Sequence, residues 1–219
     1  MNRFFSSWHS RRSLLQMAAV AVAGSAMAFS PALLAQSAME LNTPPAMGDK
    51  MLGKPDAPVT VIEYSSFTCP HCANFHVNVL PKIREKYIDT GKVKLLFREF
   101  PLGPLAAYAT MVARCVAPDK YFSFVDVLFK HMEAWRPVSK EDPLGPLAKI
   151  ALQVGMPRSE FDKCIKNEDL WAKISAEQKR ASERFKVNST PTFFIDGEKL
   201  ESSWEFDNFS KKIDERLGK

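Results

Sequence analysis

The sequence predicts an α/β fold in which a block of helices interrupts a mixed sheet. Three observations support this prediction. A β-branched, apolar run at Pro58–Ser65 is followed by a helical pattern and a second apolar run at Val93–Phe97, which together indicate a βαβ unit with parallel strands. A helical pattern then continues for about 80 residues. Strand character returns at Thr192–Ile195, so the predicted order is βαβ, helical block, ββα.

The first unit follows from its local sequence. Pro70 suits the first position of a helix, because its missing N–H would have no partner there. Asp89-Thr90-Gly91 ends this helix and leads into the second strand. Between these two points, apolar residues recur every four positions and predict one buried helix face: Phe75, Val79, Ile83 and Tyr87.

The helical block contains five candidate helices, separated by breaks that contain proline or glycine. They are expected at Leu105–Val116, Lys120–Met132, Leu144–Val154, Arg158–Lys166 and Asp169–Phe185. After the strand at Thr192–Ile195, the pair Asp196-Gly197 indicates a hairpin. A short strand is expected at Lys199–Glu201 and a final amphipathic helix at about Trp204–Leu217.

The first 35 residues have the features of an export signal. Residues 1–12 contain three arginines and no acidic residue, an apolar run follows at Leu14–Ala28, and small residues offer cleavage sites after Ala28 or Ala35. The run is short and alanine-rich for a membrane span, although an uncleaved anchor is the alternative. Arg11-Arg12 also resembles a twin-arginine signal. We expect an exported, periplasmic protein with a flexible leader over residues 36–50.

The charge of the chain comes largely from this signal. Removal of residues 1–35 takes away three positive charges and no negative ones, so the formal net charge falls from +5 to +2. The remaining basic residues alternate with Asp and Glu on stretches such as Lys173–Arg184, which is typical of a solvated helix face. No nucleic-acid-binding surface is therefore expected.

Cys69-Pro70-His71-Cys72 lies at the predicted junction between strand and helix. A thiol at a helix N-terminus meets the positive end of the helix dipole and unpaired N–H groups, both of which favour the thiolate. Cys72 has the spacing to close a small disulfide ring with Cys69. The thiolate is the nucleophile in disulfide exchange, and a thiol of low pKa is also a good leaving group. A protonated His71 would add to this stabilisation.

Other functions of this motif are less well supported. A zinc site pairs one CxxC with a second pair of ligands at close spacing, whereas Cys115 and Cys164 stand alone and far apart. Covalent haem attachment requires a histidine after the second cysteine, where this chain has Ala73. His76 is expected to be a packing or surface residue rather than a ligand. We therefore expect no metal site.

Two segments resemble a known family. Val61–Cys72 (VIEYSSFTCPHC) resembles the active-site segment of the DsbA-like disulfide oxidoreductases of the thioredoxin superfamily, and Ser189–Phe194 (STPTFF) resembles their cis-proline segment. The helical block is similar to the insertion that splits the thioredoxin-like fold in this family. The resemblance covers about residues 50–217. It implies a thioredoxin-like domain over 51–103 and 187–219, with a helical insertion over 104–186.

The resemblance also implies roles for single residues. Pro191 would be the cis-proline beside the redox pair, where substrate binds, although a trans proline is the default for most X–Pro bonds. Thr190 would tune the redox pair; some oxidases of the family have an aliphatic residue here, whereas threonine is typical of isomerase-like relatives. Glu63 matches a buried acidic residue of the oxidases, which could relay protons or oppose thiolate formation. A strand glutamate facing an edge is the alternative.

Cys115 and Cys164 look like the second, non-catalytic disulfide that some members of the family have. Joined, they would close a loop of about 50 residues, which is worth roughly 4 kcal/mol in the chain-entropy model. Two buried thiols that serve as small core residues are the alternative.

The leading hypothesis is a periplasmic dithiol oxidase that donates its Cys69–Cys72 disulfide to reduced, unfolded exported proteins. The resemblance implies reoxidation by a DsbB-like membrane quinone reductase and no tightly bound cofactor. A disulfide isomerase or thiol reductase is the first alternative, which Thr190 favours. The second is a periplasmic copper-binding protein that uses the two cysteines as soft ligands.

Overall fold

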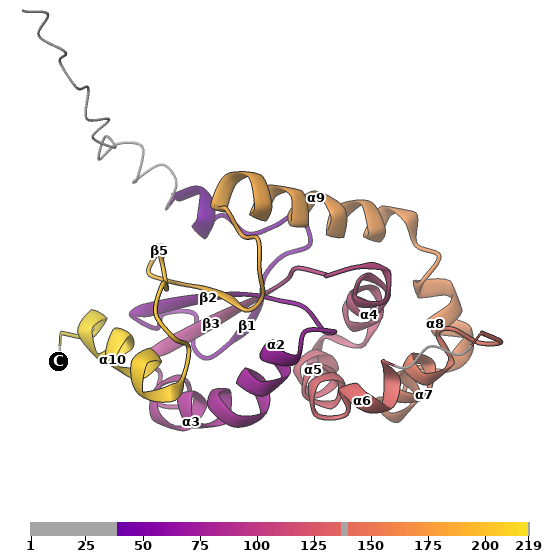
Figure 1. Ribbon diagram of the computed structural model, residues 1–219, viewed down its shortest axis with the longest axis horizontal. Helices are drawn as coiled ribbons and strands as arrows, with labels where there is room; N and C mark the ends of the chain where they lie inside the picture. The colour runs from indigo at the N-terminus through magenta and orange to yellow at the C-terminus, as the bar shows by residue number, and fades with distance from the viewer. Residues whose placement is uncertain (1–38, 137–139, 219) are drawn as a thin grey trace, which may run out of the picture.

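A computed structural model describes residues 39–136 and 140–218 of the chain, so the predicted export signal lies outside the described residues. A five-stranded mixed sheet in the order β1-β3-β2-β4-β5 forms the centre of the molecule (Figure 1). Its strands are β1 (Lys50–Leu52), β2 (Val59–Ser65), β3 (Val93–Glu99), β4 (Thr192–Ile195) and β5 (Glu198–Lys199). The α/β class is thus confirmed. Among the described helices, none is long and apolar enough to cross a membrane.

The βαβ unit forms as predicted. β2 and β3 are parallel, and Val59 lies opposite Val93 in their register. The helix between them, which we call the redox helix, runs through four consecutive segments: α2 (Pro70–Asn74), η1 (Phe75–Val79), α3 (Leu80–Ile83) and η2 (Arg84–Ile88). η1 and η2 are π-helical turns. Pro81 lies in α3 and cannot donate a helical hydrogen bond. The wider π-helical turn η1 directly precedes α3.

The helical block lies beside the sheet and then returns along it (Figure 1). Its helices are α4 (Pro104–Cys115), η3 (Pro118–Lys120), α5 (Tyr121–Lys130), α6 (Met132–Trp135), α7 (Gly145–Gln153), α8 (Arg158–Cys164) and α9 (Glu168–Phe185). The single helix predicted over Lys120–Met132 is divided: α5 ends at Lys130 and α6 follows. The Trp135 indole N–H donates to the Leu128 carbonyl at 2.8 Å, which gives that carbonyl a side-chain partner near the break.

The C-terminal part closes the sheet. β4 is antiparallel to β2, and Asp196 and Gly197 both have positive φ, as a two-residue hairpin turn requires. β5 therefore begins directly after the turn, at Glu198, one residue earlier than predicted. The last helix, α10 (Phe206–Arg216), begins two residues later than the predicted Trp204.

The alternation of side chains along β2 separates the core into two layers. Val59 and Val61 pack with the apolar residues of the redox helix, α5 and α10. Ile62 and Tyr64 point to the other face and pack with Phe185 of α9 and its neighbours. The sheet is thus covered on one face by the redox helix and α10 and on the other by α9 (Figure 1).

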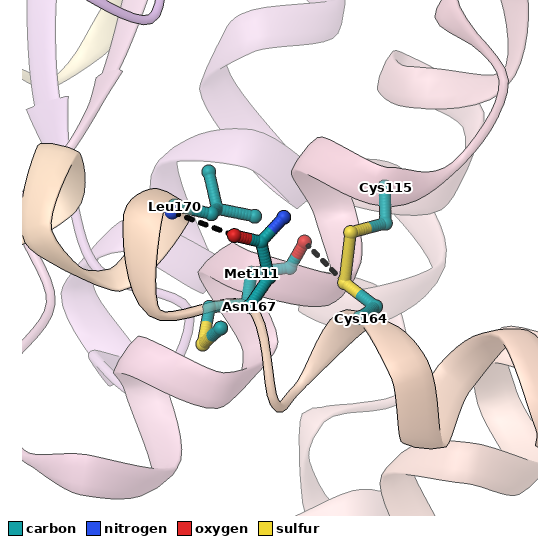
Figure 2. Close-up of a disulfide and its surroundings, with 5 residues drawn as sticks. All are labelled: Met111, Cys115, Cys164, Asn167 and Leu170. Carbon is teal, nitrogen blue, oxygen red and sulfur yellow. Dashed lines mark hydrogen bonds between the residues drawn. A yellow bond between two sulfur atoms is a disulfide. The ribbon is translucent and has the colours of Figure 1, made fainter.

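A disulfide joins Cys115, at the end of α4, to Cys164, at the end of α8 (Figure 2). This is the pairing that the family resemblance implied. The Asn167 side chain, three residues later, accepts the Leu170 N–H at 3.0 Å and caps α9. The crosslink therefore fixes the end of α8 to α4 directly before the long helix α9 begins.

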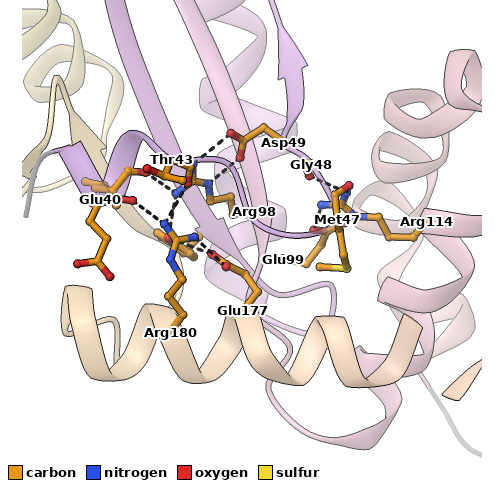
Figure 3. A network of polar contacts seen from close by, with 12 residues as sticks. Glu40, Thr43, Met47, Gly48, Asp49, Arg98, Glu99, Arg114, Glu177 and Arg180 are labelled. Atoms are coloured by element: carbon orange, nitrogen blue, oxygen red, sulfur yellow. Dashed lines mark hydrogen bonds and ion pairs between the residues drawn. The ribbon is translucent and has the colours of Figure 1, made fainter. Parts of the chain in front are cut away.

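The segment predicted to be a flexible leader, residues 36–50, differs from that expectation where the structure describes it. Leu41 is buried, and Lys50 already belongs to β1. Figure 3 shows the cause: three arginines donate to backbone carbonyls of residues 40–48. The fully buried Arg98 also donates to both carboxylate oxygens of Asp49, at 2.7 and 3.1 Å. A buried guanidinium requires such partners, and this segment supplies them.

Candidate active site

Cys69 occupies the end of the redox helix. It is the N-cap residue of α2, with extended backbone (φ −87°, ψ 119°), and Pro70 follows as the first helical residue. The predicted placement at the strand-to-helix junction is therefore correct. The N–H groups of the first helical turn have no partner within the helix, and those of His71 and Cys72 act on the Cys69 sulfur.

The surroundings of Cys69 stabilise its thiolate. They lower the pKa of its thiol from an ordinary value of 9.0 to about 5. The largest cause is a hydrogen bond with the Cys72 thiol. Burial opposes it, while the Thr190 side chain and the backbone N–H groups of Cys72 and His71 lower the pKa further. At neutral pH Cys69 is therefore a thiolate, the form that attacks sulfur.

The pKa of Cys72 is shifted in the opposite direction from that of Cys69. It lies within the first turn and has no exposed surface. Burial raises the pKa of the Cys72 thiol well above its ordinary value, and the hydrogen bond to Cys69 and the negative charge of Glu63 raise it further. The two cysteines are unpaired in this structure. They thus form a dithiol in which one sulfur is a nucleophile and the other holds its proton.

The segment before β4 faces the nucleophile. The Thr190–Pro191 peptide bond is cis, as the family resemblance implied. The Thr190 carbonyl lies 3.2 Å from the Cys69 sulfur and accepts its proton in a hydrogen bond when the sulfur is a thiol. The Thr190 hydroxyl is buried and has no hydrogen-bond partner among the described residues, so it can donate to the sulfur when this is a thiolate. Thr190 thus has one group suited to each protonation state of Cys69.

A buried acid–base pair lies behind the two thiols. Glu63 is fully buried in β2, and both its carboxylate oxygens contact Nε2 of His76, at 2.9 and 3.0 Å. The prediction that Glu63 could be a buried acid is therefore correct in position, and the alternative of an edge-facing glutamate is wrong. Rings of Phe97 and Phe129 enclose the imidazole, with centroids at 5.5 and 4.3 Å.

His71 is arranged differently from the expectation of a cation that stabilises the thiolate. Its side chain is exposed and its ring meets the edge of Trp204, with centroids 6.4 Å apart. Its contribution to the lowered pKa of Cys69 comes through its backbone N–H. The imidazole thus lies on the exposed side of the motif.

Sequence reasoning identified Glu63 but missed its partner. His76 packs in the core, one of the two positions expected for it, but the sequence does not predict its contact with Glu63. Two local signals were available. Glu63 lies on the same face of its strand as Val59 and Val61, which pack against the redox helix, and His76 follows Cys72 by one helical turn. A polar residue on each facing surface of a core must have a partner. Within residues 39–136 and 140–218, no group of three His, Cys, Asp or Glu side chains is placed to hold a metal ion.

Two thiols of opposite proton affinity beside a cis-proline segment define a thioredoxin-like site for disulfide exchange. Comparisons with known proteins agree. The sequence profile of a family described as "Thioredoxin" matches residues 46–215. A relative from Bacillus cereus, named "Probable disulfide bond formation protein D", is 34% identical over 176 residues, which cover 77% of this chain and 78% of the relative.

A protein-disulfide oxidoreductase of Rickettsia prowazekii, so named provisionally, is 32% identical over 170 residues. The chain spans about three fifths of the length of this relative (61%). Among solved structures, Wolbachia pipientis alpha-DsbA1 is 36% identical with a TM-score of 0.74, and the match covers 82% of this chain and 95% of the other. BdbD from Bacillus subtilis, at 24% identity and a TM-score of 0.69, supports the fold alone.

The chain therefore belongs to the DsbA-like branch of the thioredoxin superfamily.

Proposed function

We propose that this protein is a dithiol oxidase that donates the Cys69–Cys72 disulfide to reduced, unfolded exported proteins. The observation that supports this direction is the low pKa of Cys69, at about 5. A stabilised thiolate favours the dithiol state of the enzyme, so the disulfide is readily given away. Thr190 does not oppose this direction, because its hydroxyl and the helix N–H groups both stabilise the thiolate.

The exchange proceeds in two balanced steps. A client thiolate attacks the Cys69 sulfur; the Cys69–Cys72 bond breaks, its electron pair stays on Cys72, and this buried sulfur takes up a proton. The second client thiolate then attacks the client sulfur of the mixed disulfide and releases Cys69 as a thiolate. The client dithiol loses two electrons and two protons. The enzyme gains the two electrons, one proton stays on Cys72, and the other is released to solvent.

Exchange with clients requires an exported enzyme and a reoxidant. Residues 1–35 support export, and the Cys115–Cys164 crosslink supports an oxidising compartment, where structural disulfides persist.

The expected result of cell fractionation is a periplasmic protein shortened by about 28 to 35 residues. Arg11-Arg12→Lys-Lys should block its export if the twin-arginine route is used. The reoxidant we propose is a DsbB-like quinone reductase. Membranes supplied with quinone should therefore reoxidise the reduced Cys69–Cys72 pair.

The proposal is tested by equilibrating the protein with glutathione buffers and then supplying a reduced, unfolded client. We expect a redox potential well above the roughly −270 mV of thioredoxin and stoichiometric oxidation of the client. His131→Gln, which changes an exposed histidine outside the site, is the matched control. A potential in the reducing range, with no oxidation of the client, would exclude the oxidase and leave the reductase or isomerase in its place.

A further inference from the structure

The exchange leaves a proton problem at Cys72. Each time its bond to Cys69 breaks, a sulfur with no exposed surface must take up a proton, and each reoxidation must remove it. Cys69 is a poor source, because its low pKa leaves it a thiolate without a proton at neutral pH. The charge of Glu63 acts on Cys72, but Glu63 is itself fully buried. A second group is needed to connect Glu63 to solvent.

His76 is placed to make that connection. Its Nε2 contacts Glu63, and its Nδ1, on the other side of the ring, is buried without a hydrogen-bond partner among the described residues. His76 also lines a pocket of about 490 Å³ between the redox helix and α5. The residues that line this pocket include neither the cysteines nor the Thr190–Pro191 segment. The pocket is therefore a separate opening to solvent.

We propose that His76, through Glu63, is the route by which the proton of Cys72 exchanges with solvent in this pocket. The inference rests on the proposed function of the cysteine pair and makes His76 a positioning residue, since it acts through Glu63 and touches no substrate.

The transfer leaves the number of protons on the Glu63–His76 pair unchanged. During reduction of the disulfide, a proton from pocket solvent binds Nδ1, the Nε2 proton passes to Glu63, and the Glu63 proton passes to the Cys72 thiolate. Reoxidation reverses each transfer. The imidazole thus alternates between its two tautomers without turning over, which suits a ring enclosed by Phe97 and Phe129.

The charged groups around His76 come from several elements. Glu63 faces it from β2, and the pocket is lined by Arg84 and Glu85 of η2, Asp89 after it, and Asp126 and Lys130 of α5. Desolvation raises the pKa of the Asp126 carboxyl, and the nearby His76 and Arg84 oppose this. His76 therefore interacts electrostatically with Asp126, which lines the pocket, as well as with Glu63.

The test compares His76→Gln with the control His131→Gln. Glutamine keeps a donor for Glu63 but cannot exchange protons near neutral pH. The rates of reduction by dithiothreitol and of reoxidation by oxidised glutathione are measured from pH 5 to pH 8, together with the redox potential. In His76→Gln we expect both rates to fall by about tenfold or more, with altered pH profiles and a nearly unchanged potential, because a proton route affects rates in both directions equally. His131→Gln should match the wild type.

Rescue by a small molecule separates this role from packing. His76→Ala opens space beside the pocket, and added imidazole should restore both rates toward the wild type. Wild-type rates in His76→Gln overturn the proposal, as does a slow variant with a shifted potential that imidazole does not rescue. Because these assays use small thiols, a protein that exchanges with dithiothreitol but does not oxidise a client contradicts the proposed function and leaves the role of His76 intact.

Discussion

Replacement of Cys72 by serine should leave the protein covalently joined to its substrates through Cys69. Cys69 lies at the helix N-terminus with a low pKa, whereas Cys72 is fully buried and protonated. Once Cys69 is joined to a substrate sulfur, Cys72 is the group that can attack Cys69 and release the substrate, and a serine hydroxyl cannot replace it. Client oxidation should fall to the uncatalysed rate, and non-reducing gels of acid-quenched cells should show a ladder of adducts.

The matched control for this experiment is Cys69→Ser. It should also abolish oxidation, but it should form few adducts, because the remaining thiol is buried and holds its proton. Mass spectrometry of the adducts identifies the attached cysteine. If adducts form equally well in Cys69→Ser, through Cys72, the assignment of the two roles is reversed.

The stability of the reduced protein should depend on pH through Cys69. Its pKa is about 5 in the folded protein against an ordinary value of 9.0, so unfolding takes up a proton between these values. The stabilisation is fully present above about pH 9, falls by about 1.4 kcal/mol per pH unit, and is lost as the pH falls through about 5. At pH 7 it amounts to about 3 kcal/mol. Urea unfolding of the reduced protein at several pH values measures it.

Two controls isolate this contribution. Cys69→Ser and the oxidised protein have no Cys69 proton to release, so both should lack this pH-dependent component. Cys69→Ser keeps all other titrating groups, whereas the oxidised protein also lacks the Cys72 thiol. The pH dependence of iodoacetamide alkylation should give a midpoint near 5 for Cys69. A midpoint near 9, with parallel stability curves for the reduced protein and Cys69→Ser, would show that the helix end does not stabilise the thiolate.

Features that depend on a few neighbouring residues could be predicted from the sequence. Pro70 after a β-branched run places Cys69 at a helix end, because the preference of proline for the first helical turn is local. Asp196-Gly197 predicts its hairpin for the same kind of reason, since both residues tolerate positive φ. The cis bond at Pro191 and the Cys115–Cys164 pairing were implied by the family resemblance, and neither could be derived from spacing alone.

Periodicity and turn preferences act over a few residues, so the order of the elements and the position of the redox pair at a helix end follow from local sequence. Which polar groups meet depends on the packing of segments that are distant in the chain. Arg98 finds its partners in residues 41–49, which local sequence suggests are mobile, and Thr190 meets Cys69 across 121 positions of the chain. His76 meets Glu63 because a strand and a helix turn one polar residue each toward a shared apolar layer. Burial makes such pairing obligatory, but packing selects the partner.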